Sequence, residues 1–220
     1  MTVSRDPKKK LTPTSETVKK TLGLLDVLSG EKREWYAAEI AQAAKLPVST
    51  VFRLLTTLVQ LRFIDYDAPT RRYRLGLKLL ELGYRVSEGL DLPALANPVL
   101  RRLSDKSGET AHLSIRDGDE GVFVAKVETH HSVRMHTALG RRVPLHAGAS
   151  MKTLLAFLPD AEVEAYIRDT FGSTHAQIAE TQRLWQAINA AREKGYCFTR
   201  SEQTPGAAGV GAPVRDHTGR

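Results

Sequence analysis

The chain has 220 residues, 41% hydrophobic and 26% charged, a balance typical of folded globular domains and not of disordered chains. No apolar run approaches the roughly 20 residues that cross a bilayer, and Asp26 interrupts the run from Leu22 to Leu28, which is not typical of a signal-peptide core. Cys197 is the only cysteine, which excludes an intrachain disulfide and a zinc-ribbon cluster, and we expect a cytoplasmic protein.

The net charge of +7 is concentrated in the first part of the chain. Residues 1–90 hold 16 basic and 10 acidic side chains, whereas residues 91–220 hold 16 and 15. This asymmetry favours a polyanionic partner for the first part alone. A role in solubility explains the charge about equally well, so charge alone does not decide between the two interpretations.

The first part predicts helices followed by a β-hairpin. Residues 1–14 are polar and basic and contain two prolines, which is typical of a disordered arm. Apolar residues at helical spacing predict helices over 15–29, 36–44, 48–61 and 77–90. Alternating segments at 63–67 and 71–75, separated by a turn with Pro69, predict the hairpin. We place a domain boundary near residue 90.

The second part predicts a mixture of helices and antiparallel strands. Helical spacing recurs over 97–106, 149–158, 160–168 and 180–194. Alternation predicts strands over 110–116, 122–128, 132–138, 196–201 and 209–214, and glycines and acids at 117–121 predict a tight turn between the first two. The last predicted strand lacks an antiparallel partner, so we expect the natural protein to continue beyond residue 220.

The helix predicted over 48–61 has an outward face suited to DNA. At about 100° per residue, Val51, Leu54, Leu55 and Leu58 share one apolar face. The opposite face has no acidic residue and consists of Ser49, Arg53, Thr56 and Gln60, flanked by Thr50 and Thr57. Hydroxyls, amides and arginines reach base edges and phosphates in a major groove, whereas phosphates repel an acid.

The neighbouring elements complete a predicted winged helix-turn-helix. A helix with the small residue Ala41 and a tight turn precede the polar helix, and the hairpin that follows carries Arg71, Arg72 and Arg74. The alternative is a three-helix bundle whose outer face is only solvated, because any surface helix needs a polar face.

An ordered series of motifs resembles the IclR family of bacterial transcription regulators. The motifs are Glu39-Ile40-Ala41-Gln42, Leu46-Pro47, Ser49 to Leu58, Tyr73-Arg74-Leu75-Gly76, Gly108-Glu109-Thr110, Pro144-Leu145-His146-Ala147, Gly195-Tyr196 and Gly211-Ala212-Pro213-Val214. The resemblance covers about residues 15–220. It implies an α+β protein with a winged helix-turn-helix over 15–76, a linker helix over 77–90 and a C-terminal GAF-like antiparallel sheet with helices over 91–220. It also implies homodimers or homotetramers that bind operator DNA and a small-molecule effector.

Two groups of site residues follow from the helix face and from the resemblance. Ser49, Thr50, Arg53 and Thr56 are assigned to bases, and Lys45, Arg71 and Arg72 to phosphates. By matching to the family, the effector pocket is lined by Met135, Val143, Ala149, Ser150, Arg200 and Gly209.

The chemistry of the matched pocket residues favours an organic acid or aromatic effector. Backbone N–H groups at a helix start suit an anion, and an arginine can clamp a carboxylate. Alternatively, Arg200 is exposed or pairs with Glu202. The chain also departs from the family at three positions, because Lys45, Arg62 and Met151 stand where glycine is usual.

Two other classes of function stay open. A non-specific architectural DNA-binding protein would share the basic first part but leave the second part unexplained. A small-molecule enzyme is disfavoured, because Ser150 and His146 lie in no Gly-x-Ser-x-Gly motif and no Walker-type loop is present. The seven histidines include no His-Glu-x-x-His motif, so we expect neither a metal nor another cofactor.

Overall fold

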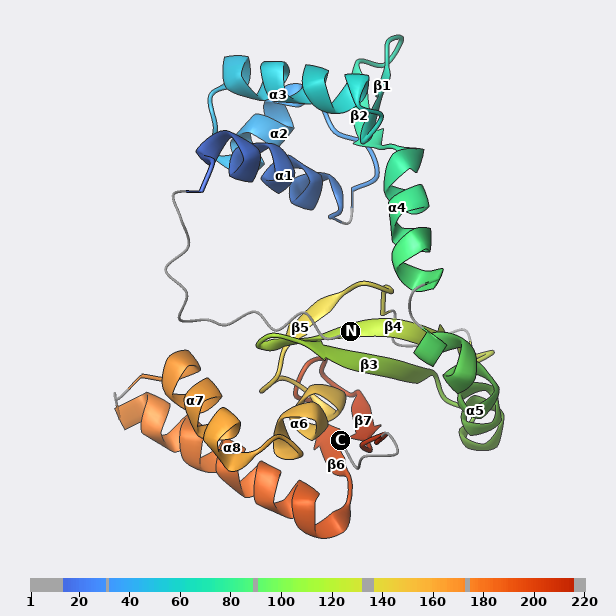
Figure 1. Cartoon of the computed structure of the whole chain (residues 1–220), viewed down its shortest axis with the longest axis vertical. Coiled ribbons are helices and arrows are strands. Elements are labelled where there is room, and N and C mark those ends of the chain that lie inside the picture. The colour runs from blue at the N-terminus through green and yellow to red at the C-terminus, as the bar shows by residue number, and fades with distance from the viewer. Residues whose placement is uncertain (1–13, 31, 89–90, 132–136, 173–174, 216–220) are drawn as a thin grey trace. The chain divides into compact units, whose positions relative to one another are not determined.

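The chain divides into two compact units, Met1–Asp91 and Leu92–Arg220, and each is considered by itself. The computed structural model describes residues 14–30, 32–88, 91–131, 137–172 and 175–215 (Figure 1). Nearly all of the arm predicted over 1–14, and most of the strand predicted over 132–138, lie outside these ranges. None of the described helices is long and apolar enough to cross a membrane.

The first unit contains the predicted helices and hairpin. Helices α1 (Glu16–Leu28), α2 (Ala37–Ala44) and α3 (Val48–Gln60) precede the antiparallel strands β1 (Ile64–Asp67) and β2 (Arg72–Leu75). Helix α4 (Leu77–Glu88) follows the hairpin. These elements confirm the predicted ones to within one or two residues at each end.

Local hydrogen bonds fix where α1 and α2 begin. The Ser15 hydroxyl accepts a hydrogen bond from the Val18 amide at 3.4 Å, which caps α1. The Glu39 carboxylate accepts one from the Tyr36 amide at 2.8 Å, at the start of α2. Each bond satisfies an amide that the first turn of a helix leaves without a partner.

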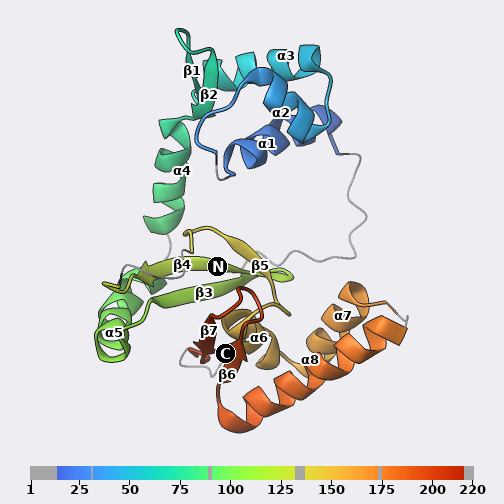
Figure 2. The same ribbon diagram turned by 180° about the vertical axis from the view of Figure 1, so that it is seen from behind.

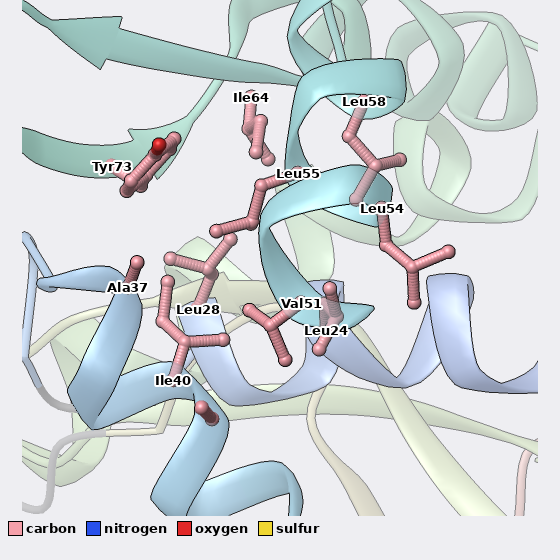
Figure 3. Close-up of a cluster of buried hydrophobic side chains, with 11 residues drawn as sticks. Leu24, Leu28, Ala37, Ile40, Val51, Leu54, Leu55, Leu58, Ile64 and Tyr73 are labelled. Carbon is pink, nitrogen blue, oxygen red and sulfur yellow. The ribbon is translucent and has the colours of Figure 1, made fainter. Parts of the chain in front are cut away.

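A single apolar core holds the first unit together. Leu24 and Leu28 of α1, Ile40 of α2 and the apolar face of α3 point toward one another, with Ile64 and Tyr73 of the hairpin closing the cluster (Figure 3). Because α3 buries its apolar face in this core, its polar face is turned to the solvent. The core therefore sets the orientation of the face that was predicted to bind DNA.

The second unit combines two antiparallel sheets with four helices among its described residues. Strands β3 (Ala111–Asp117), β4 (Glu120–Val127) and β5 (Arg142–Pro144) pair in that order. Strands β6 (Cys197–Arg200) and β7 (Ala208–Gly211) form a second antiparallel pair, so the expectation that the last strand lacks an antiparallel partner was wrong. The helices are α5 (Asp91–Ser107), α6 (Ala149–Ala156), α7 (Asp160–Thr170) and α8 (His175–Lys194), and Figure 2 shows the same elements from behind.

Helices α5 and α6 contact opposite faces of the three-stranded sheet. Leu100 of α5 packs with Ala111 and Leu113, whose side chains share one face of β3. Met151 of α6 packs on Gly121 of β4, which pairs with Arg116 and therefore belongs to the other face. A separate apolar core joins α6, α7 and α8 around Leu155, Val163 and Ile188.

Three elements of the second unit differ from their predictions. Helix α5 begins at Asp91 and not at residue 97, because Pro93 lies in the first turn, where a helix tolerates proline. Helix α8 begins at His175, five residues before its predicted start. Strand β5 was not predicted, since its three residues are too short for alternation and are defined by pairing with Glu120–Val122.

Candidate nucleic-acid interface and effector site

The outward face of α3 presents the four residues that were predicted to contact bases. Ser49, Arg53 and Thr56 are exposed and Thr50 is half-buried, whereas Val51 and Leu55 on the opposite face are fully buried. Helix α3 contains no acidic residue. The arrangement leaves neutral and cationic groups on a convex helical surface, which matches a major groove in charge and shape.

The threonine hydroxyls of this face have a defined hydrogen-bonding role. Thr56 Oγ1 donates to the Phe52 carbonyl at 2.9 Å, and Thr57 Oγ1 donates to the Arg53 carbonyl at 3.2 Å. Since each hydroxyl proton is used within the helix, the lone pairs are what remain for a ligand. These threonines therefore offer acceptors, which suit the exocyclic amino groups of cytosine and adenine.

The turn before α3 retains its geometry although Lys45 replaces the usual glycine. Lys45 has φ 54° and ψ 42°, its amide donates to the Gln42 carbonyl at 3.2 Å, and the Leu46 amide donates to the Ala41 carbonyl at 3.0 Å. This pair of bonds defines a Schellman motif with a left-handed residue after the helix. The departure from glycine therefore leaves the turn in place and strains the backbone of an exposed cation by about 1–2 kcal/mol.

Arg62 ends α3 in the same way. Its φ is 62°, its amide donates to the Val59 carbonyl at 2.9 Å, and the Phe63 amide donates to the Leu58 carbonyl at 2.9 Å. Both helices of the helix-turn-helix therefore end in a Schellman motif that carries a basic residue.

The hairpin arginines differ in their surroundings. Arg71 is exposed at the turn with φ 55° and forms no ion pair with another described residue. Arg72 is half-buried, donates to Glu34 Oε2 at 3.1 Å and stacks 5.1 Å from the ring centroid of Tyr36. Hydrogen bonds with Tyr36 and Glu34 raise the pKa of Arg72. Arg72 thus ties the hairpin to the segment before α2, a contact that the sequence analysis missed.

The start of α6 brings together part of the predicted effector site. Ala149 and Ser150 form the first turn of α6, and a Cβ on Gly209 would lie 3.5 Å from the Ala149 Cβ. The Thr153 hydroxyl lies 2.9 Å from both the Ala149 and the Gly211 carbonyls, so its one proton is shared between α6 and β7 and holds them together. Ala149, Ser150 and Gly209 are therefore neighbours.

Arg200 is exposed at the end of β6, opposite Ala208. This exposure is what the alternative to a carboxylate clamp expected, although Glu202 pairs with Lys152, whose Nζ lies 2.5 Å from Glu202 Oε1. Met135 lies outside the described residues.

Met151 fills the space between α6 and the sheet. Its side chain is buried, and its sulfur lies against Gly121, where no side chain intervenes. Val143 is also buried and pairs with Gly121 across β4 and β5. The methionine that replaces the usual glycine therefore packs on the sheet beside Val143.

Two polar side chains of β3 face the same side of the sheet as Met151. His112, Ser114 and Arg116 alternate along β3, and Arg116 pairs with Gly121. His112 Nε2 and Ser114 Oγ are buried without a hydrogen-bond partner among the described residues. Burial, and to a lesser extent the charge of Lys126, lowers the pKa of His112, which favours a neutral imidazole. The alternation of the predicted strand 110–116 already placed both residues on one face, but the sequence analysis did not select them.

Two open hollows among the described residues lie elsewhere. One of about 610 Å³ is lined by Ala187, Tyr196, Phe198 and Val210, and one of about 540 Å³ lies between α7 and α8 beside Phe171 and Trp185. Neither is lined by a residue that was predicted to bind the effector.

His146, just before α6, contacts a tyrosine, and the described residues hold no metal cluster. His146 Nδ1 lies 2.8 Å from the Tyr166 hydroxyl, so this imidazole has a partner other than Ser150. Across the described ranges, no group of three histidine, cysteine or acidic residues is placed to hold a metal ion.

Both units of the chain match families of known proteins. Residues 17–68 match the IclR helix-turn-helix domain, and residues 84–220 match the bacterial transcriptional regulator IclR C-terminal domain. The chain is 36% identical over 207 residues to the HTH-type transcriptional regulator KipR of Bacillus subtilis, which covers 92% of this chain and 81% of KipR.

Solved structures agree. An IclR transcriptional regulator from Alicyclobacillus acidocaldarius has a TM-score of 0.77 at 27% identity, covering 94% of this chain and 85% of that one. An IclR homologue from Microbacterium hydrocarbonoxydans, solved in complex with 4-hydroxybenzoate, has a TM-score of 0.75 at 23% identity, covering 91% and 84%. At that identity, the second likeness concerns the fold.

Proposed function

Because the chain belongs to the IclR family of bacterial transcriptional regulators, we propose that α3 reads operator DNA and that a small organic acid or aromatic effector in the second unit alters this binding. The family is one of ligand-responsive regulators with a helix-turn-helix domain. The proposal assigns DNA binding to residues 15–76, a linker role to 77–90 and effector binding to 91–220. Such a regulator acts in the cytoplasm on chromosomal DNA, and we assign it no catalytic role.

The observation that carries the DNA assignment is the acid-free outward face of α3. We assign base contacts to Ser49, Arg53 and Thr56, because they are exposed opposite the buried apolar face, and to the half-buried Thr50, which flanks them. Lys45, at the turn before α3, is exposed and can reach a phosphate.

Arg71 supplies a second phosphate contact from the tip of the hairpin. Its neighbour Arg72, also assigned to phosphate, holds the hairpin in place through Glu34 and Tyr36, and any phosphate contact by Arg72 would compete with that ion pair.

Helix α4 supports a homodimer. Leu77, Leu80 and Tyr84 share one side of α4 and are exposed, and Leu82 and Val86 are exposed on another side. A helix that is apolar on two sides needs a partner, and a second copy would supply one while placing two α3 helices on two operator half-sites. Sedimentation of the whole chain tests this, since Leu80→Asp should shift the protein toward monomers.

The effector assignment rests on the first turn of α6 and on two buried polar groups of β3 that face the same side of the sheet as Met151. The first turn of α6 offers the backbone amides of Ala149 and Ser150, which suit a carboxylate. His112 and Ser114 add two polar atoms that lack a partner among the described residues. A bound 4-hydroxybenzoate in the Microbacterium relative supports an acid of this kind. Arg200 would approach the carboxylate from the end of β6, and Val143 and Gly209 would bound the site.

A combined binding experiment tests the proposal. The whole chain is used to select duplexes from a random DNA library, and the affinity for the selected duplex is then measured with and without each member of a carboxylate panel that includes 4-hydroxybenzoate. We expect enrichment of a two-fold symmetric site and a change in affinity with at least one carboxylate. Equal affinity for selected and scrambled duplexes would instead favour the architectural alternative.

A further inference from the structure

Two apolar side chains of α3 are exposed between the buried apolar face and the residues assigned to bases. Val48 and Phe52 are one turn apart, and 47% and 51% of their surface is exposed. Neither belongs to the core of the first unit, although Val51, Leu54, Leu55 and Leu58 of the same helix do. We call Val48 and Phe52 the apolar edge of α3.

The apolar edge cannot be separated from the proposed base-reading residues. Around the helix axis, Phe52 lies about 40° from both Val48 and Thr56 and about 60° from Ser49. The Phe52 carbonyl also accepts the hydrogen bond from Thr56 Oγ1 at 2.9 Å, which fixes the Thr56 rotamer above it. Any approach of α3 that brings Ser49 and Thr56 to base edges therefore brings Phe52 there as well.

The chemistry of the major groove indicates which DNA group the apolar edge contacts. Thymine is the only base that presents a methyl group there, and phenylalanine is among the side chains that contact it. Isolated exposed apolar residues are ordinary on protein surfaces, but these two form a continuous line with Thr56 on a helix without acidic residues. DNA, which is a polyanion and carries thymine methyl groups in its major groove, matches this surface in charge and in polarity.

We propose that Val48 and Phe52 read thymine methyl groups, so that the operator half-site carries thymine where the apolar edge meets the groove. This proposal rests on the proposed function, because it needs α3 to enter the major groove. It adds a specificity determinant that forms no hydrogen bond, beside the polar contacts of Ser49, Arg53 and Thr56.

Replacing thymine by uracil tests the proposal, because the exchange removes only the methyl group and keeps base pairing. A duplex selected from a random library by the whole chain is amplified once with thymidine and once with deoxyuridine triphosphate, and both products are titrated by fluorescence anisotropy. For the wild-type chain we expect at least a fourfold loss of affinity on the uracil duplex, the equivalent of ~0.8 kcal/mol for one buried methyl-sized group.

Variants assign the effect to the apolar edge. Phe52→Ala should bind the thymine duplex more weakly than the wild type and should lose little or nothing further on the uracil duplex. Leu61→Ala removes a residue of similar exposure, 56%, at the C-terminal end of α3 and should keep the wild-type ratio between the two duplexes. Phe52→Leu, which stays apolar, should keep part of the ratio, and thermal unfolding checks that each variant is folded.

Each result decides between the proposals. A wild-type chain that binds both duplexes equally, or a Phe52→Ala variant that keeps the full ratio, overturns the methyl contact while leaving operator binding intact. A library that yields no enriched sequence overturns sequence-specific binding itself, and the apolar edge with it.

Discussion

Lys45, which adopts the left-handed backbone conformation before α3, can be replaced by glycine to test both its backbone strain and the role of its charge in DNA binding. Lys45 has φ 54° and ψ 42°, where a residue with a Cβ is disfavoured by about 1–2 kcal/mol. Lys45→Gly removes this strain. It also gives the unfolded chain about 0.4–1 kcal/mol of additional conformational entropy and removes a cation worth about 0.3–1 kcal/mol at the end of α2. These contributions oppose one another, so we expect stability to change by less than about 1 kcal/mol.

The same variant should change DNA binding clearly. If Lys45 neutralises one phosphate, Lys45→Gly should reduce the slope of log affinity against log salt by about 0.9, the value expected for one phosphate. The assay is anisotropy on the selected duplex across a salt series, with thermal unfolding measured in parallel. Ser201→Gly is the matched control, because Ser201 has φ 53° and lies in the second unit. A Lys45→Gly slope equal to that of the wild type would refute the phosphate contact.

Three further predictions concern the core, a histidine and the effector. Leu55→Ala removes a fully buried side chain from the first core and should lower the free energy of unfolding by about 2–5 kcal/mol, measured by urea denaturation. Burial lowers the pKa of His112 in the folded chain, so the unfolded chain takes up the proton first and stability is lost as the pH falls below about 6.5. His112→Phe should flatten the decline in melting temperature between pH 7 and pH 5, and an unchanged decline would contradict this assignment. Arg200→Ala should weaken the tightest-binding carboxylate of the panel in calorimetry without changing DNA affinity, and equal ligand affinity would remove Arg200 from the site.

The outward face of α3 could be predicted from the sequence because its determinants are local. The apolar spacing of Val51, Leu54, Leu55 and Leu58 sets the buried side of α3, and the polar side follows from the same helical period. The ends of α2 and α3 were also predictable. Lys45 and Arg62 stand in place of glycine there, but the Schellman hydrogen bonds hold both residues in the left-handed conformation, so both helices still end within a residue of where they were predicted to end.

The partners of individual side chains depend on distant residues and could not be predicted. Arg72 binds Glu34, which lies 38 positions away, so its role in fixing the hairpin follows only from the fold. Strand β5 exists through its pairing with β4, and three residues carry no periodic signal of their own. The position of Met151 could likewise not be predicted, because it depends on Gly121 of a distant strand, which leaves room for the Met151 sulfur on the sheet.

The central claim is that the outward face of α3 distinguishes one DNA sequence from another. The most direct measurement is the affinity of the wild type and of Arg53→Ala for the selected duplex and for a scrambled duplex of equal length, at one fixed salt concentration. We predict that the wild type prefers the selected duplex by at least about 1,000-fold, and that Arg53→Ala loses about 1–3 kcal/mol on it while binding the scrambled duplex with little change. An Arg53→Ala variant that retains the wild-type preference would contradict the account.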